Sequence, residues 1–202
     1  MGDKFSTVNI RLYLSPEQSA QEENDLRELL FGYSCPVNKD VEMYLREQAI
    51  EFTLKDQSVT YLVFSNINAE LLGYFTIAVK PIIINAKNFS NHMKRKLSRS
   101  GEYDEITQTY SLAAYLVAQL GKNFAHDADK SISGKELLDL ALDQVRELQY
   151  QAGGTVVFLE SEDNESLRNF YQQENGFKQF GYRETNSPKQ ERHKLVQMLK
   201  II

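Results

Sequence analysis

The sequence predicts a mixed-sheet α/β sandwich rather than a doubly wound fold. Segments with strand-like alternation and segments with helical periodicity follow one another along most of the chain, and two strand-like segments close it. A length of 202 residues with 42% hydrophobic residues is sufficient for one domain with its own core. The sequence contains no internal repeat or low-complexity segment. We therefore expect a single domain over residues 1–202.

The first half of the chain predicts two helices and three strands. Residues 8–14 alternate apolar and polar side chains and predict a strand, and the Ser-Pro pair that follows suits the start of a helix within 15–33. Residues 58–66 and 71–84 are rich in β-branched and aromatic residues and predict a hairpin of two central strands. A second helix is predicted within 38–56, where five apolar positions share one face: Val41, Tyr44, Leu45, Ala49 and Phe52.

The second half predicts an insertion followed by alternating strands and helices. The polar interval 85–108 is longer than most connections, and we expect it to carry a short helix at 93–97. After it, strands are predicted at 109–125, 155–163, 176–184 and 193–202, and helices at 134–154 and 164–175. The longer of these two helices has an apolar stripe and ends at a Gly-Gly pair.

The stretch "DKSISGKELL", residues 129–138, joins a strand to this long helix and permits two interpretations. Ser133 and Glu136 have the spacing of a capping box, in which each side chain satisfies the backbone donor of the other residue. Alternatively, a phosphate would meet the free amides of the first helical turn together with the ammonium groups of Lys130 and Lys135. The stretch alone does not decide between them.

The composition bounds the function classes. A formal net charge of −5 gives no overall attraction for nucleic acid or anionic membranes. The single cysteine, Cys35, excludes an internal disulfide, and we expect it to be a buried apolar residue. His92 and His193 have no carboxylate or cysteine at ligand spacing, so no metal is indicated. The sequence shows no signal core and no run of about 18 apolar residues, which favours a cytoplasmic protein without a membrane span.

Three segments carry a family resemblance: "NESLRNFYQQENGFKQFGYRE", "AQLGKNFA" and "ELLGYFTIAV". They resemble the GNAT superfamily of acyl-CoA-dependent acyltransferases. The segment "NESLRNFYQQENGFKQFGYRE" is similar to the family's Asn, Phe-Tyr and Gly-Phe run near the end of the domain. "AQLGKNFA" resembles a strand segment of the branch that includes tRNA-acetylating toxins, and "ELLGYFTIAV" resembles the paired strand before it. The resemblance implies a mostly antiparallel mixed sheet with helices on both faces. It also implies acetyl transfer from acetyl-CoA to a primary amine by direct attack, without a metal.

The resemblance also implies roles for individual residues. Tyr171 matches a tyrosine whose hydroxyl protonates the departing thiolate, which a phenol of pKa near 10 can do at neutral pH. Asn164 would either hydrogen-bond the pantetheine arm or cap the helix. The remaining positions that would hold acetyl-CoA are Leu120, Gly121, Ile132, Ser133, Gly134 and Lys135.

The turn departs from the pattern of the family, which is Gln or Arg, two residues, Gly, one residue, and Gly or Ala. Asp129 stands at the first position, Ile132 at the first glycine and Gly134 at the second. A β-branched Ile132 disfavours positive φ angles and would crowd an approaching phosphate. No general base is assigned, because Glu160, Glu162 and His126 are more typical of solvated strand-end and loop residues.

The insertion gathers Lys94, Arg95, Lys96 and Arg99, which on a helix would form a basic face for RNA phosphates or an ordinary solvated surface. The acceptor amine stays open among aminoacyl-tRNA, a protein and a small molecule, and a homodimer also stays open. The alternative function is a catalytically weak GNAT-like interaction module that uses this basic insertion.

Overall fold

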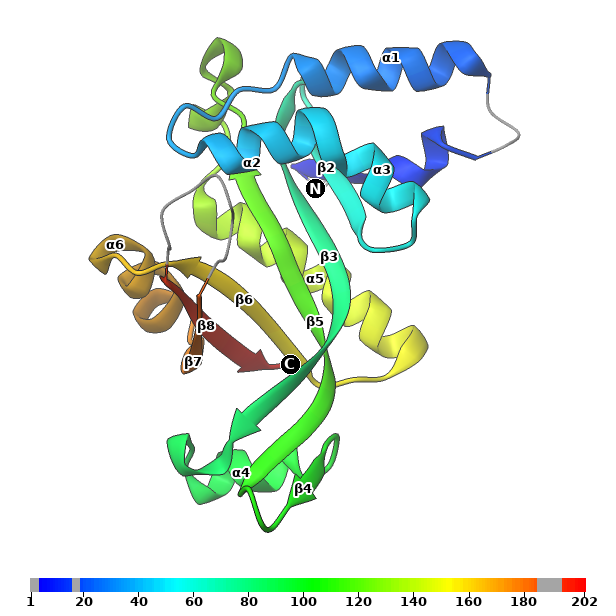
Figure 1. Ribbon diagram of the computed structural model, residues 1–202. Helices are drawn as coiled ribbons and strands as arrows, with labels where there is room; N and C mark the ends of the chain where they lie inside the picture. Colours follow the sequence, from blue (N-terminus) through cyan, green and yellow to red (C-terminus); the bar gives the residue numbers. More distant parts are fainter. Residues whose placement is uncertain (1–3, 16–18, 185–193) are drawn as a thin grey trace. The chain divides into compact units, whose positions relative to one another are not determined.

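The computed structural model describes residues 4–15, 19–184 and 194–202 (Figure 1). The chain divides into two compact units that interleave along the sequence. The first unit comprises residues 1–78 and 118–144, and the second comprises residues 79–117 and 145–202.

The described residues form one eight-stranded sheet. Its strand order is β1-β2-β3-β5-β6-β8-β7, and β4 pairs with β5 off this path. The strands are β1 (Phe5–Asn9), β2 (Val59–Ser65), β3 (Leu71–Asn85), β4 (Glu102–Asp104), β5 (Thr109–Lys122), β6 (Val156–Glu162), β7 (Lys178–Glu184) and β8 (Lys194–Ile201). The β5–β6 pair is parallel, whereas β1–β2, β2–β3, β4–β5, β6–β8 and β7–β8 are antiparallel. The predicted mixed sheet is confirmed.

Six α-helices, together with 3₁₀ turns and π-helical turns, connect these strands in the described part of the chain. The helices are α1 (Ala20–Phe31), α2 (Lys39–Met43), α3 (Ala49–Leu54), α4 (Asn91–Leu97), α5 (Gly134–Ala152) and α6 (Glu165–Arg168). The π-helical turns are Tyr44–Gln48 and Asn169–Glu174, and the 3₁₀ turns are Ile10–Tyr13, Ala86–Asn88 and Ala125–Lys130.

Two predictions near the N-terminus are wrong in their boundaries. The strand predicted at 8–14 ends at Asn9, because the Asn9 side chain accepts a hydrogen bond from the Arg11 amide and starts a 3₁₀ turn. The first helix does not begin at the Ser-Pro pair. It begins after Ser19, whose hydroxyl and backbone form a capping box with Glu22.

The second predicted helix is confirmed as the continuous run of α2, a π-helical turn and α3. Its predicted apolar face is buried at Val41, Tyr44, Leu45 and Ala49 and packs in the core of the first unit with Leu26, Leu30, Leu62 and Tyr74, while Phe52 is partly buried. This core fixes the loop between α1 and α2 against the sheet.

The insertion lies in the second unit, at the far end of β3 and β5 (Figure 1). The predicted short helix is confirmed as α4, and its Leu97 packs in the core of the unit. The sequence did not predict β4, which pairs Glu102–Asp104 with Thr109–Ser111. The Tyr103 ring packs against that of Tyr110 of β5 at a tilt of 42°, with 4.9 Å between the ring centroids.

Helix α5 follows its prediction closely. Leu137, Leu138, Ala141, Leu142 and Val145 are buried, and the helix ends where Gly153 and Gly154 adopt φ angles of 78° and 91°. Only glycine populates such angles readily, so the Gly-Gly pair ends the helix for the reason that the sequence indicated.

Candidate active site

The turn that opens α5 forms the predicted capping box. The Glu136 Oε2 atom accepts hydrogen bonds from the Ser133 amide and the Ser133 hydroxyl, both at 2.8 Å. The Glu136 amide donates to Ser133 Oγ at 3.1 Å in return. Lys4 donates to Glu136 Oε1 at 3.0 Å. These contacts, led by the hydrogen bond from the Ser133 backbone, lower the pKa of Glu136 to about 2, so its carboxylate is charged at neutral pH.

Ile132 does not obstruct the turn. Its side chain is 2% exposed and lies in the core, and its backbone is not among the described positions with positive φ. Left-handed backbone occurs earlier, at His126 and Asp127. The Lys122 ammonium then fixes the turn by donating to the Asp129 carbonyl at 2.8 Å. The objection that a β-branched residue would crowd a phosphate therefore does not apply to this turn.

Two amides of the turn remain available. Within the described residues, the Gly134 and Lys135 amides make no hydrogen bond, as expected for the first turn of a helix. The flanking lysines are paired, since Lys135 contacts Asp139 at 2.7 Å and Lys130 contacts Asp127 at 3.0 Å. Both pairs are exposed, and such pairs contribute little and exchange readily.

Gly121 permits a close approach of the α1–α2 region to strand β5. A Cβ atom at this position would overlap Tyr33 Oη and Val41 Cγ1. A Cβ atom on Gly73 of the neighbouring strand would lie 2.6 Å from the Gly121 carbonyl oxygen. Leu120, the preceding residue, is partly buried. Gly121, one of the residues predicted to hold acetyl-CoA on β5, therefore lies at a close contact within the first unit.

In the second unit, Tyr171 lies in the π-helical turn that follows α6. The Tyr171 carbonyl accepts from the Phe177 amide at 2.9 Å, and the Asn175 side chain donates to the Phe170 carbonyl at 2.7 Å. Gly176 makes the return possible with a φ of 72°. Single π-helical turns inside α-helices often mark functional positions. The sequence "ENGF" therefore fixes the backbone on which Tyr171 is presented.

The Tyr171 ring is held by two aromatic neighbours. Its centroid lies 4.9 Å from that of Phe170 and 5.9 Å from that of Phe177. The side chain is half-buried, and its hydroxyl has no hydrogen-bond partner among the residues that the structure describes. Burial alone raises the pKa of Tyr171 to about 12, so the hydroxyl carries its proton throughout the physiological range.

Asn164 caps α6. Its Oδ1 atom accepts a hydrogen bond from the Leu167 amide at 2.9 Å, and the backbone amide of Asn164 donates to the Glu162 carbonyl at 3.1 Å. Capping uses only the acceptor, so the Nδ2 group keeps two donors for a ligand. Of the two roles that the sequence left open, the cap is present.

The three candidate bases differ in their surroundings. Glu160 accepts from Gln197 Nε2 at 2.8 Å and pairs with Arg183 at 3.2 Å, so both of its oxygens have partners. Glu162 and His126 are exposed. Their surroundings do not single out a general base.

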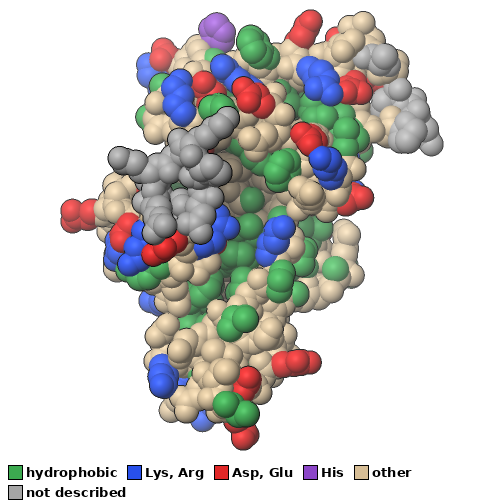
Figure 2. All heavy atoms as spheres, viewed as in Figure 1, with side chains coloured by type: hydrophobic (Ala, Val, Ile, Leu, Met, Phe, Trp, Pro, Cys, Tyr) green, Lys and Arg blue, Asp and Glu red, His purple; other side chains and the backbone are tan. Residues whose placement is uncertain are grey.

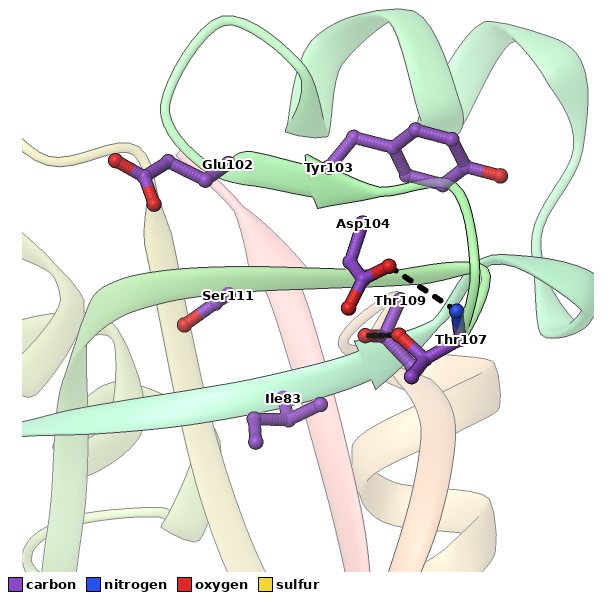
Figure 3. A pocket seen from close by; sticks show the side chains of 7 residues that line it. All are labelled: Ile83, Glu102, Tyr103, Asp104, Thr107, Thr109 and Ser111. Carbon is purple, nitrogen blue, oxygen red and sulfur yellow. Dashed lines mark hydrogen bonds between the residues drawn. The ribbon is translucent and has the colours of Figure 1, made fainter.

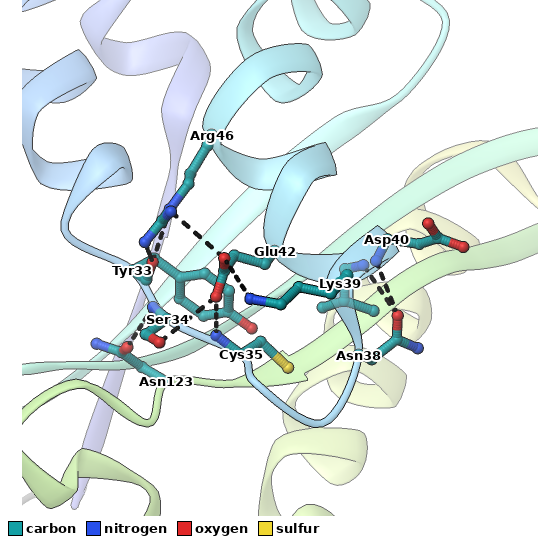
Figure 4. Close-up of polar contacts among 10 residues, drawn as sticks. Tyr33, Ser34, Cys35, Asn38, Lys39, Asp40, Glu42, Arg46 and Asn123 are labelled. Carbon is teal, nitrogen blue, oxygen red and sulfur yellow. Dashed lines mark hydrogen bonds and ion pairs between the residues drawn. The ribbon is translucent and has the colours of Figure 1, made fainter.

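A buried carboxylate that the sequence did not predict organises the loop between α1 and α2 (Figure 4). Glu42 accepts from the Cys35 amide at 2.7 Å and pairs with Arg46 at 3.3 Å. The Cys35 amide is the main reason why the pKa of Glu42 is lowered. Cys35 itself is buried, as predicted. The sequence contained a signal for this arrangement. Asn38 is a strong N-cap residue, and a helix that begins after Asn38 fixes the direction of the Glu42 side chain.

Asn123, at the end of β5, holds the same loop to the sheet. Its Oδ1 atom accepts from the Ser34 amide at 3.0 Å and from the Ala125 amide at 3.1 Å, and its Nδ2 group donates to the Leu71 carbonyl at 2.8 Å. The side chain is buried, and both its oxygen and its nitrogen make hydrogen bonds. The α1–α2 loop is therefore a rigid part of the first unit.

The insertion carries separated charges. Arg95, Lys96 and Arg99 are exposed and Lys94 is partly exposed, and none of the four forms an ion pair within the described residues. Acidic side chains gather around β4 at the end of the second unit (Figure 2). There a pocket of about 470 Å³ is lined by Ile83, Glu102, Tyr103, Asp104, Thr107, Thr109 and Ser111 (Figure 3). Asp104 accepts from the Ile106 and Thr107 amides, which lowers its pKa.

The described residues show neither a metal site nor a membrane-spanning helix. No group of three or more His, Cys, Asp or Glu residues has the arrangement of a metal site in the described ranges; His193 lies outside them. No helix in the described part of the chain has the length and hydropathy needed to span a membrane.

Comparison with known proteins identifies the fold. The chain is similar to AtaT complexed with acetyl-methionyl-tRNAfMet, with a TM-score of 0.59 and 14% identity over 95% of this chain and 93% of that one. It is similar to a tyrosine-to-phenylalanine mutant of KacT, with a TM-score of 0.60 and 14% identity over 96% and 95%. It is also similar to AtaTR bound with AcCoA, with a TM-score of 0.53 and 12% identity over 99% and 94%.

No protein-family model and no curated protein matches the sequence. The structural similarity nevertheless extends over nearly the whole chain, and these neighbours have the GNAT fold of the branch that the sequence resembles. At this level of identity the similarity shows the fold alone.

Proposed function

We propose that the chain is an N-acetyltransferase that transfers an acetyl group from acetyl-CoA to the primary amine of an aminoacyl-tRNA. The observation that carries this proposal is the Tyr171 hydroxyl, which belongs to a half-buried side chain, carries its proton and has no hydrogen-bond partner in the described residues. The fold supports it, since one structural neighbour is bound to acetyl-methionyl-tRNA and another to acetyl-CoA.

Acetyl-CoA would supply the activated acetyl group as a thioester. Tyr171 would hold a proton at Oη and deliver it to the sulfur as the C–S bond breaks, while the attacking amine loses a proton to solvent or to a base that is not yet assigned. A pKa of about 12 keeps the proton on Tyr171 until it is needed. The same burial would raise the basicity of a thiolate beside it, which keeps the transfer favourable.

The other predicted residues would bind rather than react. The open amides of Gly134 and Lys135 fit the pyrophosphate of acetyl-CoA, and Asn164 Nδ2 fits an amide carbonyl of the pantetheine arm. The backbone of Leu120 and Gly121 would pair with that arm along β5. Ser133 fits less well, because Glu136 already uses its amide and hydroxyl.

The acceptor is assigned from the insertion and from one comparison. The four unpaired cations at Lys94, Arg95, Lys96 and Arg99 would neutralise RNA phosphates on a chain that is otherwise acidic. A protein amine or a small amine would not need them. The neighbour complexed with acetyl-methionyl-tRNA makes an aminoacyl-tRNA the first acceptor to test.

A second function is favoured by a specific observation. Because the Glu136 carboxylate occupies the donors of Ser133, the turn is closed by its own cap, as expected of an interaction module that no longer binds acetyl-CoA. This module would use the basic insertion alone to bind RNA or protein.

Thermal unfolding with acetyl-CoA separates the two functions. At about 100 times its dissociation constant, a ligand of the native state adds about 2.7 kcal/mol of stability, which gives a clear rise in melting temperature. Gly134→Asp should abolish the rise, because a carboxylate beside the open amides repels pyrophosphate. Release of free thiol with a panel of aminoacyl-tRNA, protein and small amines then identifies the acceptor. No shift at millimolar acetyl-CoA would contradict the enzyme.

A further inference from the structure

The anion-binding position of the α5 turn is filled by a carboxylate of the chain itself. Glu136 Oε2 takes two donors from Ser133, and Oε1 takes the ammonium of Lys4 from the other end of the sequence. Both carboxylate oxygens are therefore satisfied. An external phosphate group would have to take the Ser133 amide from an anion that already holds it.

The rest of the turn does not compensate for this competition. The ammonium groups of Lys130 and Lys135 are each paired with an aspartate, at 3.0 Å and 2.7 Å. Glu136 also adds a negative charge next to the two amides that stay open, those of Gly134 and Lys135. The Glu136 carboxylate therefore disfavours anion binding in two ways. It occupies the donors of Ser133, and its negative charge repels the anion.

A second capping box in the chain distinguishes this effect from ordinary capping. At the start of α1, Glu22 Oε2 accepts from the Ser19 amide at 2.8 Å and from the Ser19 hydroxyl at 3.0 Å, which is the same geometry. Within the described residues, Glu22 has no lysine partner. The box alone is thus a common device for starting a helix. The combination with Lys4 and with the α5 turn is particular to Glu136.

A pocket lies beside Lys4, the partner of Glu136. Lys4 lines a pocket of about 420 Å³ together with Phe5, Ile67, Lys130 and Ser131, all within the first unit. The Glu136 side chain is 40% exposed and that of Lys4 is 59% exposed, so neither is held by packing.

We infer that Glu136 determines the affinity of the α5 turn for acetyl-CoA, because the pyrophosphate binds Ser133 only after displacing the Glu136 carboxylate toward Lys4. This inference rests on the proposed function, since it assigns a specificity-determining role at the same site. Glu136 acts as an internal competitor and does not touch the reacting atoms.

The test replaces the charge and keeps the cap. Glu136→Gln retains a capping box, because glutamine serves as well as glutamate at this position. Glu22→Gln makes the same exchange in the matched box of α1. The dissociation constant of CoA is measured by calorimetry for the unmodified chain and both variants, and melting temperatures confirm that each is folded. We expect CoA to bind about tenfold more tightly to Glu136→Gln, and the gain to shrink as salt rises. Glu22→Gln should leave the affinity unchanged.

A second measurement does not depend on a variant. In the unmodified chain, the ¹H–¹⁵N signal of the Ser133 amide should move when CoA is added, because its acceptor changes from carboxylate to phosphate. The Ser19 amide signal should not move.

The outcomes separate the inference from the proposed function. If the unmodified chain binds CoA and Glu136→Gln binds it within twofold, Glu136 does not control affinity and only the inference is overturned. If Glu136→Gln binds CoA and the unmodified chain does not, the inference stands and the natural chain is closed to the ligand. If neither binds CoA and the Ser133 signal does not move, both the inference and the acetyltransferase function are overturned.

Discussion

Tyr171 is the residue at which a catalytic and a packing role diverge most clearly. Its ring packs between Phe170 and Phe177, which a helix on a sheet requires in any case. Its hydroxyl, however, makes no hydrogen bond within the described residues, and the packing of the ring does not require it. The oxygen atom is therefore the part of Tyr171 that needs a functional explanation.

Tyr171→Phe should abolish most of the turnover without unfolding the protein. The exchange deletes one oxygen and keeps the ring, so the free energy of unfolding should change by no more than about 1 kcal/mol. If the hydroxyl is the acid, turnover should fall by about 100-fold or more while CoA still binds. Thiol release and melting temperature measure the two effects.

Tyr171→Ala is the matched variant for packing. It removes the ring, so stability should fall by about 3 kcal/mol or more. Turnover above about a third of normal in Tyr171→Phe would exclude the acid role, because that effect is well under 1 kcal/mol in barrier height.

At the scale of elements, the sequence predicted what periodicity and caps determine. The apolar stripe and the Gly-Gly end predicted α5, and the short helix predicted at 93–97 corresponds to α4. The spacing of Ser19 and Glu22 is that of a capping box and marks the start of α1, whereas the Ser-Pro pair at residues 15 and 16 predicts a start that is too early. Strand β4 was not readable. It has three polar or aromatic residues, and only its pairing with β5 makes it a strand.

In the candidate site, too, the sequence predicted the local contacts but not the contacts between distant residues. The capping box of Ser133 and Glu136 follows from local spacing, and the structure confirms it. The contact between Lys4 and Glu136 joins residues 132 positions apart, and no local pattern predicts such a contact. The buried position of Ile132 likewise depends on tertiary packing.

Replacing the four basic residues of the insertion tests whether this element binds RNA. Changing Lys94, Arg95, Lys96 and Arg99 together to Ala removes four unpaired charges and leaves Leu97 in the core, so the fold should persist. RNA affinity should fall steeply, and the dependence of the binding constant on salt should weaken, because fewer counterions are released. Filter binding of tRNA at several salt concentrations measures both.

The acidic side of the insertion provides the control. Changing Glu102 and Glu105 to Gln alters exposed residues of the same insertion without removing a cation. It should not weaken tRNA binding. Unchanged RNA affinity in the four-residue variant would show that α4 is an ordinary solvated surface.

At the scale of the whole molecule, several carboxylates link stability to pH in the same direction. The pKa values of Glu42, Asp104, Glu136 and Asp163 are all lowered by hydrogen bonds that favour the charged form, from backbone amides in the first three and from Arg168 in the last. A carboxylate with a lowered folded-state pKa stabilises the fold above its unfolded pKa, and it loses this contribution as the pH falls through the folded value. Acid should therefore destabilise both units.

Glu136→Gln should make the protein less sensitive to acid. The folded pKa of Glu136 is about 2 and the ordinary value is 4.5, so its contribution is complete above about pH 4.5 and disappears as the pH falls toward about 2. Because the side chain is 40% exposed, solvent screening limits the contribution to about 1 kcal/mol. Urea unfolding at about pH 6, about pH 4.5 and about pH 3 should show that the unmodified chain is more stable than the variant at pH 6 and that the difference shrinks at pH 3. A constant difference across this range would mean that the carboxylate is not bound at Ser133 in the folded state, and the internal competitor for the anion position would then be absent.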